Sequence, residues 1–75
     1  QAAQILALIA DAPGSLTINE ISERLYVHAK GFHVLLAIEE VAAHVEYLYQ
    51  HGKLTIANLD EFQREENPPI RYVVA

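Results

Sequence analysis

The sequence predicts a mainly helical domain with a small antiparallel β-hairpin. Three segments carry apolar residues at helical spacing, and the third of these is much the longest. Two segments rich in β-branched and aromatic residues follow near the C-terminus, with a polar loop between them. Helix, helix, long helix, strand, loop and strand is the order of elements in a winged helix-turn-helix, in which that loop is the wing.

The first helix is expected over about residues 2–12. Its apolar side chains recur at helical spacing and should face the core: Ile5, Leu8, Ile9 and Ala12. The turn-forming tripeptide Pro13-Gly14-Ser15 comes next and ends the helix. Leu16 can then make a short extended contact.

The second helix is expected over about residues 18–25. Thr17 with Glu20 three residues later has the form of a capping box, in which each side chain bonds to the backbone amide of the other residue. This helix should turn three apolar side chains to the core: Ile18, Ile21 and Leu25. A polar connector over residues 26–32, with Gly31 as its pivot, leads to the third helix.

The third helix is expected over about residues 33–51 and should cross the whole domain. At 1.5 Å per residue, a helix of this length is roughly 28 Å long. Its apolar positions recur at alternating steps of four and three residues and form one stripe: Val34, Ile38, Val41, Val45 and Leu48. Gly52 supplies the left-handed conformation that commonly closes a helix.

The two strands are expected over about residues 53–57 and 70–74, where the sequence reads KLTIA and IRYVV. The loop between them, residues 58–69, is too polar to pack except through Leu59 and Phe62. Its Pro68-Pro69 pair favours an extended backbone leading into the last strand. Together these segments predict a hairpin with a wide tip.

Composition limits the classes of protein to which the chain can belong. Its 75 residues suffice for one small domain, and 52% of them are hydrophobic, which is enough for one core. There is no cysteine for a disulfide framework, and no stretch reaches the roughly 18 apolar residues that span a bilayer. We therefore expect a cytoplasmic protein. Because the chain has no methionine and begins at Gln1, we also expect it to be a piece of a longer protein.

The charge of the chain argues against DNA binding, the usual function of a winged helix. Affinity for a duplex comes mostly from lysine and arginine contacts to phosphates. The net charge is −5, and the third helix carries three carboxylates and no lysine or arginine. The loop adds four carboxylates against one arginine: Asp60, Glu61, Glu65 and Glu66 against Arg64. Several repulsive interactions of about 0.5–2 kcal/mol each would outweigh the few scattered cations.

The residues indicate no metal, cofactor or catalytic site. The pairs His28–His33 and His44–His51 are five and seven residues apart, whereas zinc-binding helices usually carry two ligands four residues apart. His44 is more simply a buried or half-buried histidine with one hydrogen bond, and His51 suits the negative end of the helix dipole. No serine has a neighbouring base in a nucleophile pattern, and the adjacent glutamates of the third helix point to different sides.

Contact with another protein is the remaining use of the surface. Aromatic residues are favoured at interfaces because they bury much area at small entropic cost. The candidate partner contacts lie in the connector and on the third helix: Tyr26, Phe32, Glu39, Glu46, Tyr47 and Gln50. A simpler interpretation is that Phe32 and Tyr49 only complete the core. So small a domain nevertheless has more large apolar residues than its interior can cover, so we expect a docking face on the third helix.

The chain also resembles a known family over nearly its whole length. The segments QILALIADAPGSLTINEISERLY, LLAIEEVAAHVEYLYQHGKL and IRYVVA resemble the small C-terminal winged-helix domain that follows the catalytic domain in many metallo-β-lactamase-fold hydrolases. The distinctive part is Ala43-His44-Val45 with Leu48 and Gly52-Lys53 before the first strand of the wing. The resemblance implies an accessory module that packs on the catalytic domain, borders the substrate pocket and often helps dimerise. The family's metal ligands lie in the catalytic domain, so no catalytic residue carries over to this chain.

The sequence therefore predicts a non-catalytic protein-interaction module attached to a metal-dependent hydrolase. Its partner would be its own or a separate catalytic domain, or a second copy of the chain. One alternative is a winged helix-turn-helix transcription regulator whose DNA contacts come from a dimer mate or from a basic tail outside these residues. A second alternative is a stand-alone acidic inhibitor or nucleic-acid mimic, which fits the net charge but has no specific motif.

Overall fold

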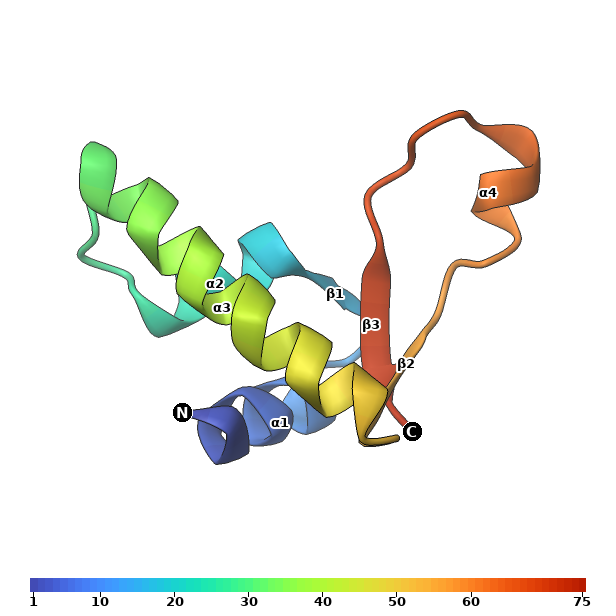
Figure 1. The fold of residues 1–75 in the computed structure, drawn as a ribbon, viewed down its shortest axis with the longest axis horizontal. Helices are drawn as coiled ribbons and strands as arrows, with labels where there is room; N and C mark the ends of the chain where they lie inside the picture. Colours follow the sequence, from blue (N-terminus) through green and yellow to red (C-terminus); the bar gives the residue numbers. More distant parts are fainter.

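A computed structural model describes residues 1–75, and it is mainly helical with a small antiparallel sheet (Figure 1). This confirms the expected balance of helix and strand. The elements follow along the chain in this order: α1 (Ala2–Asp11), β1 (Leu16–Thr17), α2 (Ile18–Leu25), α3 (Phe32–Gln50), β2 (Leu54–Ile56), α4 (Glu61–Arg64) and β3 (Arg71–Val74). The three expected helices are present as α1, α2 and α3, within one residue of their expected bounds.

The sheet has three strands where the sequence predicted a two-stranded hairpin. Strand β3 lies in the centre of the order β1-β3-β2, and both of its neighbours run antiparallel to it. On one side Leu16 is paired with Tyr72, and on the other Leu54 is paired with Val74. A strand as short as β1 has no alternating pattern to reveal it. It forms because β3 offers a free edge to the segment before α2.

One core lies between α3, the two shorter helices and the sheet. In Figure 1, α1 lies below α3, and the sheet stands beside the C-terminal end of α3. The core side chains come from all of these elements: Ile5, Ile9, Leu16, Ile21, Val41, Val45, Leu48, Leu54 and Tyr72. The other apolar residues that α1 and α2 were expected to contribute are half-buried at its margin: Leu8, Ala12, Ile18 and Leu25. The helical periodicity of the sequence therefore located most of the core.

A hydrogen-bond network joins the start of α2 to the sheet. The expected capping box is formed, with the Glu20 amide donating to Thr17 Oγ1 at 3.1 Å and the Thr17 amide donating to Glu20 Oε1 at 2.9 Å. The guanidinium of Arg71 donates to Ser15 Oγ at 2.8 Å and also to Glu20 Oε1 at 3.1 Å. One carboxylate thus caps α2 and holds β3.

The pKa of Glu20 lies below its ordinary value as a result of this network. The hydrogen bond from the Thr17 backbone is the main cause, and the positive charges of Arg71 and Arg24 add to it, while partial desolvation acts in the opposite direction. Each of these hydrogen bonds and charges favours the ionised carboxylate. The network is therefore sensitive to acid.

The loop over residues 58–69 is closed at its base by one buried side chain. Asn58 Nδ2 donates to the carbonyl of Pro69 at 2.8 Å, and Asn58 Oδ1 accepts from the amide of Arg71 at 2.9 Å. The loop contains the short helix α4, which the sequence analysis did not predict. Leu59 and Phe62 were expected to pack there but are 64% and 41% exposed, because the loop extends away from the core (Figure 1).

The first turns of α3 also depart from expectation. Val34 was placed in the core stripe, yet it is 39% exposed, and Ile38 is only half-buried. The buried residues of α3 begin at Ala37. The apolar stripe therefore starts one turn before the part of α3 that the rest of the domain buries. The N-terminal end of α3 and the connector before it lie at one edge of the molecule (Figure 1).

Replacing Asn58 should loosen the base of the loop. In Asn58→Ala the Pro69 carbonyl and the Arg71 amide lose their partner, and we expect a loss of about 1–3 kcal/mol in the free energy of unfolding. Urea denaturation followed by circular dichroism measures this loss. The matched control is Asn67→Ala, because Asn67 is exposed in the same loop. Equal stability of the two variants would contradict the role assigned to Asn58.

Replacing Glu20 should change how stability depends on pH. Because the folded pKa of Glu20 is lowered from an ordinary value of 4.5, its stabilising effect is complete above that pH and is lost as the pH falls through the lower folded pKa. We expect Glu20→Gln to be less stable than the parent near neutral pH, with a difference that shrinks in acid. Urea titrations across this range measure it. Glu66→Gln, in the exposed loop, should show no such trend.

Candidate functional site

The outer face of α3 is opposite the core and carries most of the expected contact residues. Phe32, Glu39 and Glu46 are seven residues apart and Gln50 follows four residues later, so these side chains lie along one line on the helix. All four residues are exposed. The core residues of α3 lie on the opposite side of the helix. The helical repeat therefore places these four candidates on one face, spread along the length of α3.

An exposed apolar surface lies at the N-terminal end of α3, and we call it the apolar end. Its members are the connector residue Val27 and four residues of the first two turns of α3: Phe32, Val34, Leu35 and Leu36. Phe32 is 69% exposed and Leu35 58% exposed. The interpretation that Phe32 and Tyr49 complete the core is wrong, since Tyr49 is also 46% exposed. Neither residue belongs to the buried core.

The carboxylates of α3 have no cationic partner. The two ion pairs of the structure are Arg64–Asp60 and Arg71–Glu20, and both lie outside α3. Glu46 Oε1 accepts from the Gln50 side chain at 3.3 Å, and Glu40 Oε2 accepts from a tyrosine hydroxyl at 2.7 Å. Their negative charges remain unneutralised. The outer face of α3, with Glu40 beside it, therefore favours a cationic partner.

Tyr26 positions the connector and is only half exposed. Its hydroxyl donates to Glu40 Oε2 at 2.7 Å and lies 3.4 Å from Gln1 Oε1, so it joins the connector to α3 near the start of α1. The pKa of Tyr26 is raised, first by the hydrogen bond to Glu40 and then by partial burial and the Glu40 charge. Of the six candidate contacts, Tyr26 is therefore the one with a structural role inside the domain.

The C-terminal end of α3 carries an aromatic pair. The rings of Tyr47 and His51 have centroids 4.1 Å apart, and His51 Nδ1 lies 2.9 Å from the Tyr47 carbonyl oxygen. The same carbonyl also accepts from the backbone amide of His51 at 3.1 Å, so the ring and the backbone of His51 both contact it. Tyr47 is 54% exposed and flanks the outer face. His44 is half-buried as expected, but the hydrogen bond expected for it is not made to any protein group.

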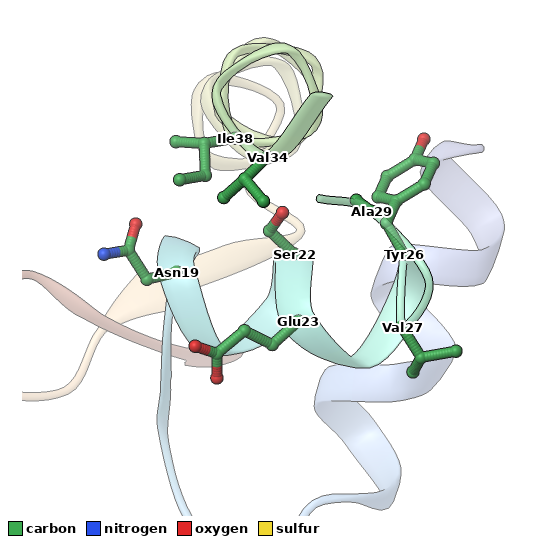
Figure 2. Close-up of a pocket in the computed structure, with 8 residues that line it drawn as sticks. All are labelled: Asn19, Ser22, Glu23, Tyr26, Val27, Ala29, Val34 and Ile38. Carbon is green, nitrogen blue, oxygen red and sulfur yellow. The ribbon is translucent and has the colours of Figure 1, made fainter. Parts of the chain in front are cut away.

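A groove runs between α2 and the N-terminal half of α3, and sequence reasoning did not predict it. Its volume is about 360 Å³. Figure 2 shows Val34 and Ile38 pointing from α3 toward α2, above Ser22. The lining residues come from both helices and from the connector: Asn19, Ser22, Glu23, Tyr26, Val27, Ala29, Val34 and Ile38. The available signal was the length of the apolar stripe, which exceeds what the eight residues of α2 can cover.

The structure contains neither a cluster of metal-ligating side chains nor a membrane-spanning helix. No three side chains of histidine, aspartate or glutamate come together as ligands. None of the helices is both long enough and apolar enough to cross a bilayer. The candidate site is therefore a surface of mixed apolar and acidic character.

Removing the Glu40 carboxylate should release Tyr26. In Glu40→Ala we expect the pKa of Tyr26 to fall toward its ordinary value of 10.0, because the main cause of its elevation is lost. In the parent, the stabilising effect of this contact is complete below that pH and is lost as the pH rises through the raised folded pKa. The ¹³Cζ shift of Tyr26, followed by NMR in alkali, measures the change. Glu39→Ala removes the neighbouring carboxylate and should leave Tyr26 unchanged.

No protein-family model matches the chain, and neither a curated protein nor a solved structure is similar enough to count as a match. Three surface features bear on the function: the exposed apolar end, the unpaired carboxylates of α3 and the groove beside them.

Proposed function

We propose that this chain is a winged-helix domain that binds another protein through α3 and that it acts as a non-catalytic accessory module. The order of its elements and the sheet order β1-β3-β2 support the winged-helix assignment, with residues 58–69 as the wing. The outer face of α3 carries the proposal, because it combines unpaired carboxylates with an exposed apolar end. In this fold α3 occupies the position that meets a partner.

The charge distribution favours a protein over a nucleic acid. A duplex carries closely spaced phosphates, and each contact to a phosphate requires a lysine, an arginine or a hydrogen-bond donor. The helix α3 presents three carboxylates instead, and the tip of the wing is acidic as well. Of the five cations of the chain, Arg64 and Arg71 are already held in ion pairs. Too few remain to neutralise a phosphate backbone.

The apolar end supplies the energy for protein contact. Burying one Phe or Leu side chain stabilises a complex by about 1.5–3 kcal/mol relative to leaving it in water. Phe32, Leu35 and Leu36 are each 45% exposed or more and sit on consecutive turns of one rigid helix. Their positions are set before binding, so little entropy is lost when a partner covers them.

The attachment to a metal-dependent hydrolase rests on the family resemblance described above. Under this proposal the catalytic domain is the partner, and the distinctive AHVEYL segment lies in the C-terminal half of α3. The reading frame that encodes this chain should then also encode a metal-binding hydrolase domain upstream. A frame that encodes this chain without such a domain would contradict the attachment but not the protein-binding role.

A titration with duplex DNA should show at most weak binding. At about 50 mM salt, where electrostatic attraction to DNA is strongest, we expect no sub-micromolar binding of a labelled duplex in fluorescence anisotropy. The charge-reversed variant Glu39→Lys/Glu46→Lys is the matched comparison and should bind more tightly than the parent. Sub-micromolar binding by the parent would refute the proposal and favour the transcription regulator.

The apolar and aromatic contacts should matter for association with the catalytic domain. When the two domains are expressed separately and mixed, we expect Phe32→Ala and Tyr47→Ala to weaken binding by about 1–3 kcal/mol each in calorimetry. Val74→Ala is a control, because Val74 is 41% exposed and lies in the sheet, outside α3. Equal effects of all three substitutions would contradict the assignment of the interface to α3.

A further inference from the structure

We infer that the groove between α2 and the N-terminal half of α3 binds a basic amphipathic helix of a partner protein, an inference that rests on the protein-binding function proposed above. The groove is about 360 Å³ in volume, which is at the lower end of the range of ligand pockets and is room for the side chains of one helix face. It shares Val27 and Val34 with the apolar end, so that one partner can cover both.

The groove has an apolar wall on α3 and a polar wall on α2, where Asn19, Ser22 and Glu23 line it. Val34 and Ile38 form the α3 side (Figure 2), and Val27 and Ala29 of the connector also line the groove. Leu35 lies three residues before Ile38 and therefore neighbours it on the surface of the helix. The apolar lining thus continues over the edge of the groove onto the apolar end. A partner helix with apolar residues at i, i+3 or i+4, and i+7 matches a strip of this kind.

Carboxylates stand on both sides of this strip. Glu23 lines the groove from α2, and Glu39 follows Leu35 by four residues on α3. Neither carboxylate is held in an ion pair. The nearby cations Arg24 and Lys30 line no part of the groove. A helix with lysine or arginine on both sides of its apolar face would therefore meet opposite charges, and an acidic helix would be repelled.

The nature of the walls selects a helix over an extended peptide. Both walls are α-helices, whose backbone amides and carbonyls are already bonded internally, so they offer no free edge to which a strand could add. A helical ligand brings its own backbone bonds. A second copy of this chain is the poorer occupant, because its net charge of −5 and its own α3 carboxylates would face those of the first.

Three synthetic helical peptides test the inference. They differ only at the apolar positions and at the charged positions on either side of them. The first carries leucine at i, i+3 and i+7 with lysine on both sides; the second has glutamate in place of each lysine; the third has serine in place of each leucine. We expect the first to bind and the others to bind at least tenfold more weakly. The ¹⁵N-labelled chain should report binding through the amide shifts of Ala29, Val34 and Ile38.

Two pairs of variants locate the binding site. Glu23→Gln/Glu39→Gln should weaken binding of the lysine peptide several-fold. Glu65→Gln/Glu66→Gln removes the same charge from the distant loop and should leave binding unchanged. Val34→Ser should weaken binding about tenfold, and Leu59→Ser, an exposed apolar position in the loop, should leave it unchanged. The glutamate variants alter only exposed side chains, so they remain informative if Val34→Ser fails to fold.

Several outcomes would overturn the inference. These are no binding of the lysine peptide, equal losses in the two glutamine pairs, or groove shifts that depend on the concentration of the chain itself. The proposed function fails separately, through tight DNA binding. If the peptide does not bind while Phe32→Ala still weakens association with the catalytic domain, the function stands and the groove assignment falls.

Discussion

The position of β3 between β1 and β2 is the constraint on which the rest of the structure depends. The last strand of the chain bonds to a segment that precedes α2 and to another that follows α3, so both halves meet in one sheet. Arg71 of β3 also holds Glu20, whose carboxylate caps α2. A domain of this size has little core to spare, and these polar links orient its helices.

The helix α3 serves two purposes along its length. Its C-terminal half supplies Val41, Val45 and Leu48 to the core and is fixed by the sheet and α1. Its N-terminal half extends beyond that core and leaves apolar side chains in solvent. Because one continuous helix joins the two halves, the packing of the first orients the surface of the second. The Tyr26–Glu40 contact holds the connector in place beside that surface.

Local patterns predicted the helices well, and the failures have two causes. The spacing of apolar residues located α1, α2 and α3, and the capping box and the positive φ of +73° at Gly52 are present as expected. Helix α4 was not predicted, and β1 was expected only as an extended contact at Leu16, since each is too short to carry a periodic pattern. Val34 was placed in the core because periodicity identifies the apolar side of a helix. It does not show how far along the helix the rest of the domain buries that side.

The sequence by itself determined the helical content, the outer face of α3 and the excess of negative charge, because these follow from spacing and composition. Only the tertiary structure decided which part of the apolar stripe is covered. An α2 of eight residues, followed by a connector that turns outward, leaves Val34 and Ile38 lining a groove. The carboxylates of Glu23 and Glu39 border the same apolar strip for the same reason, since only the packing of α2 on α3 brings them to its two sides.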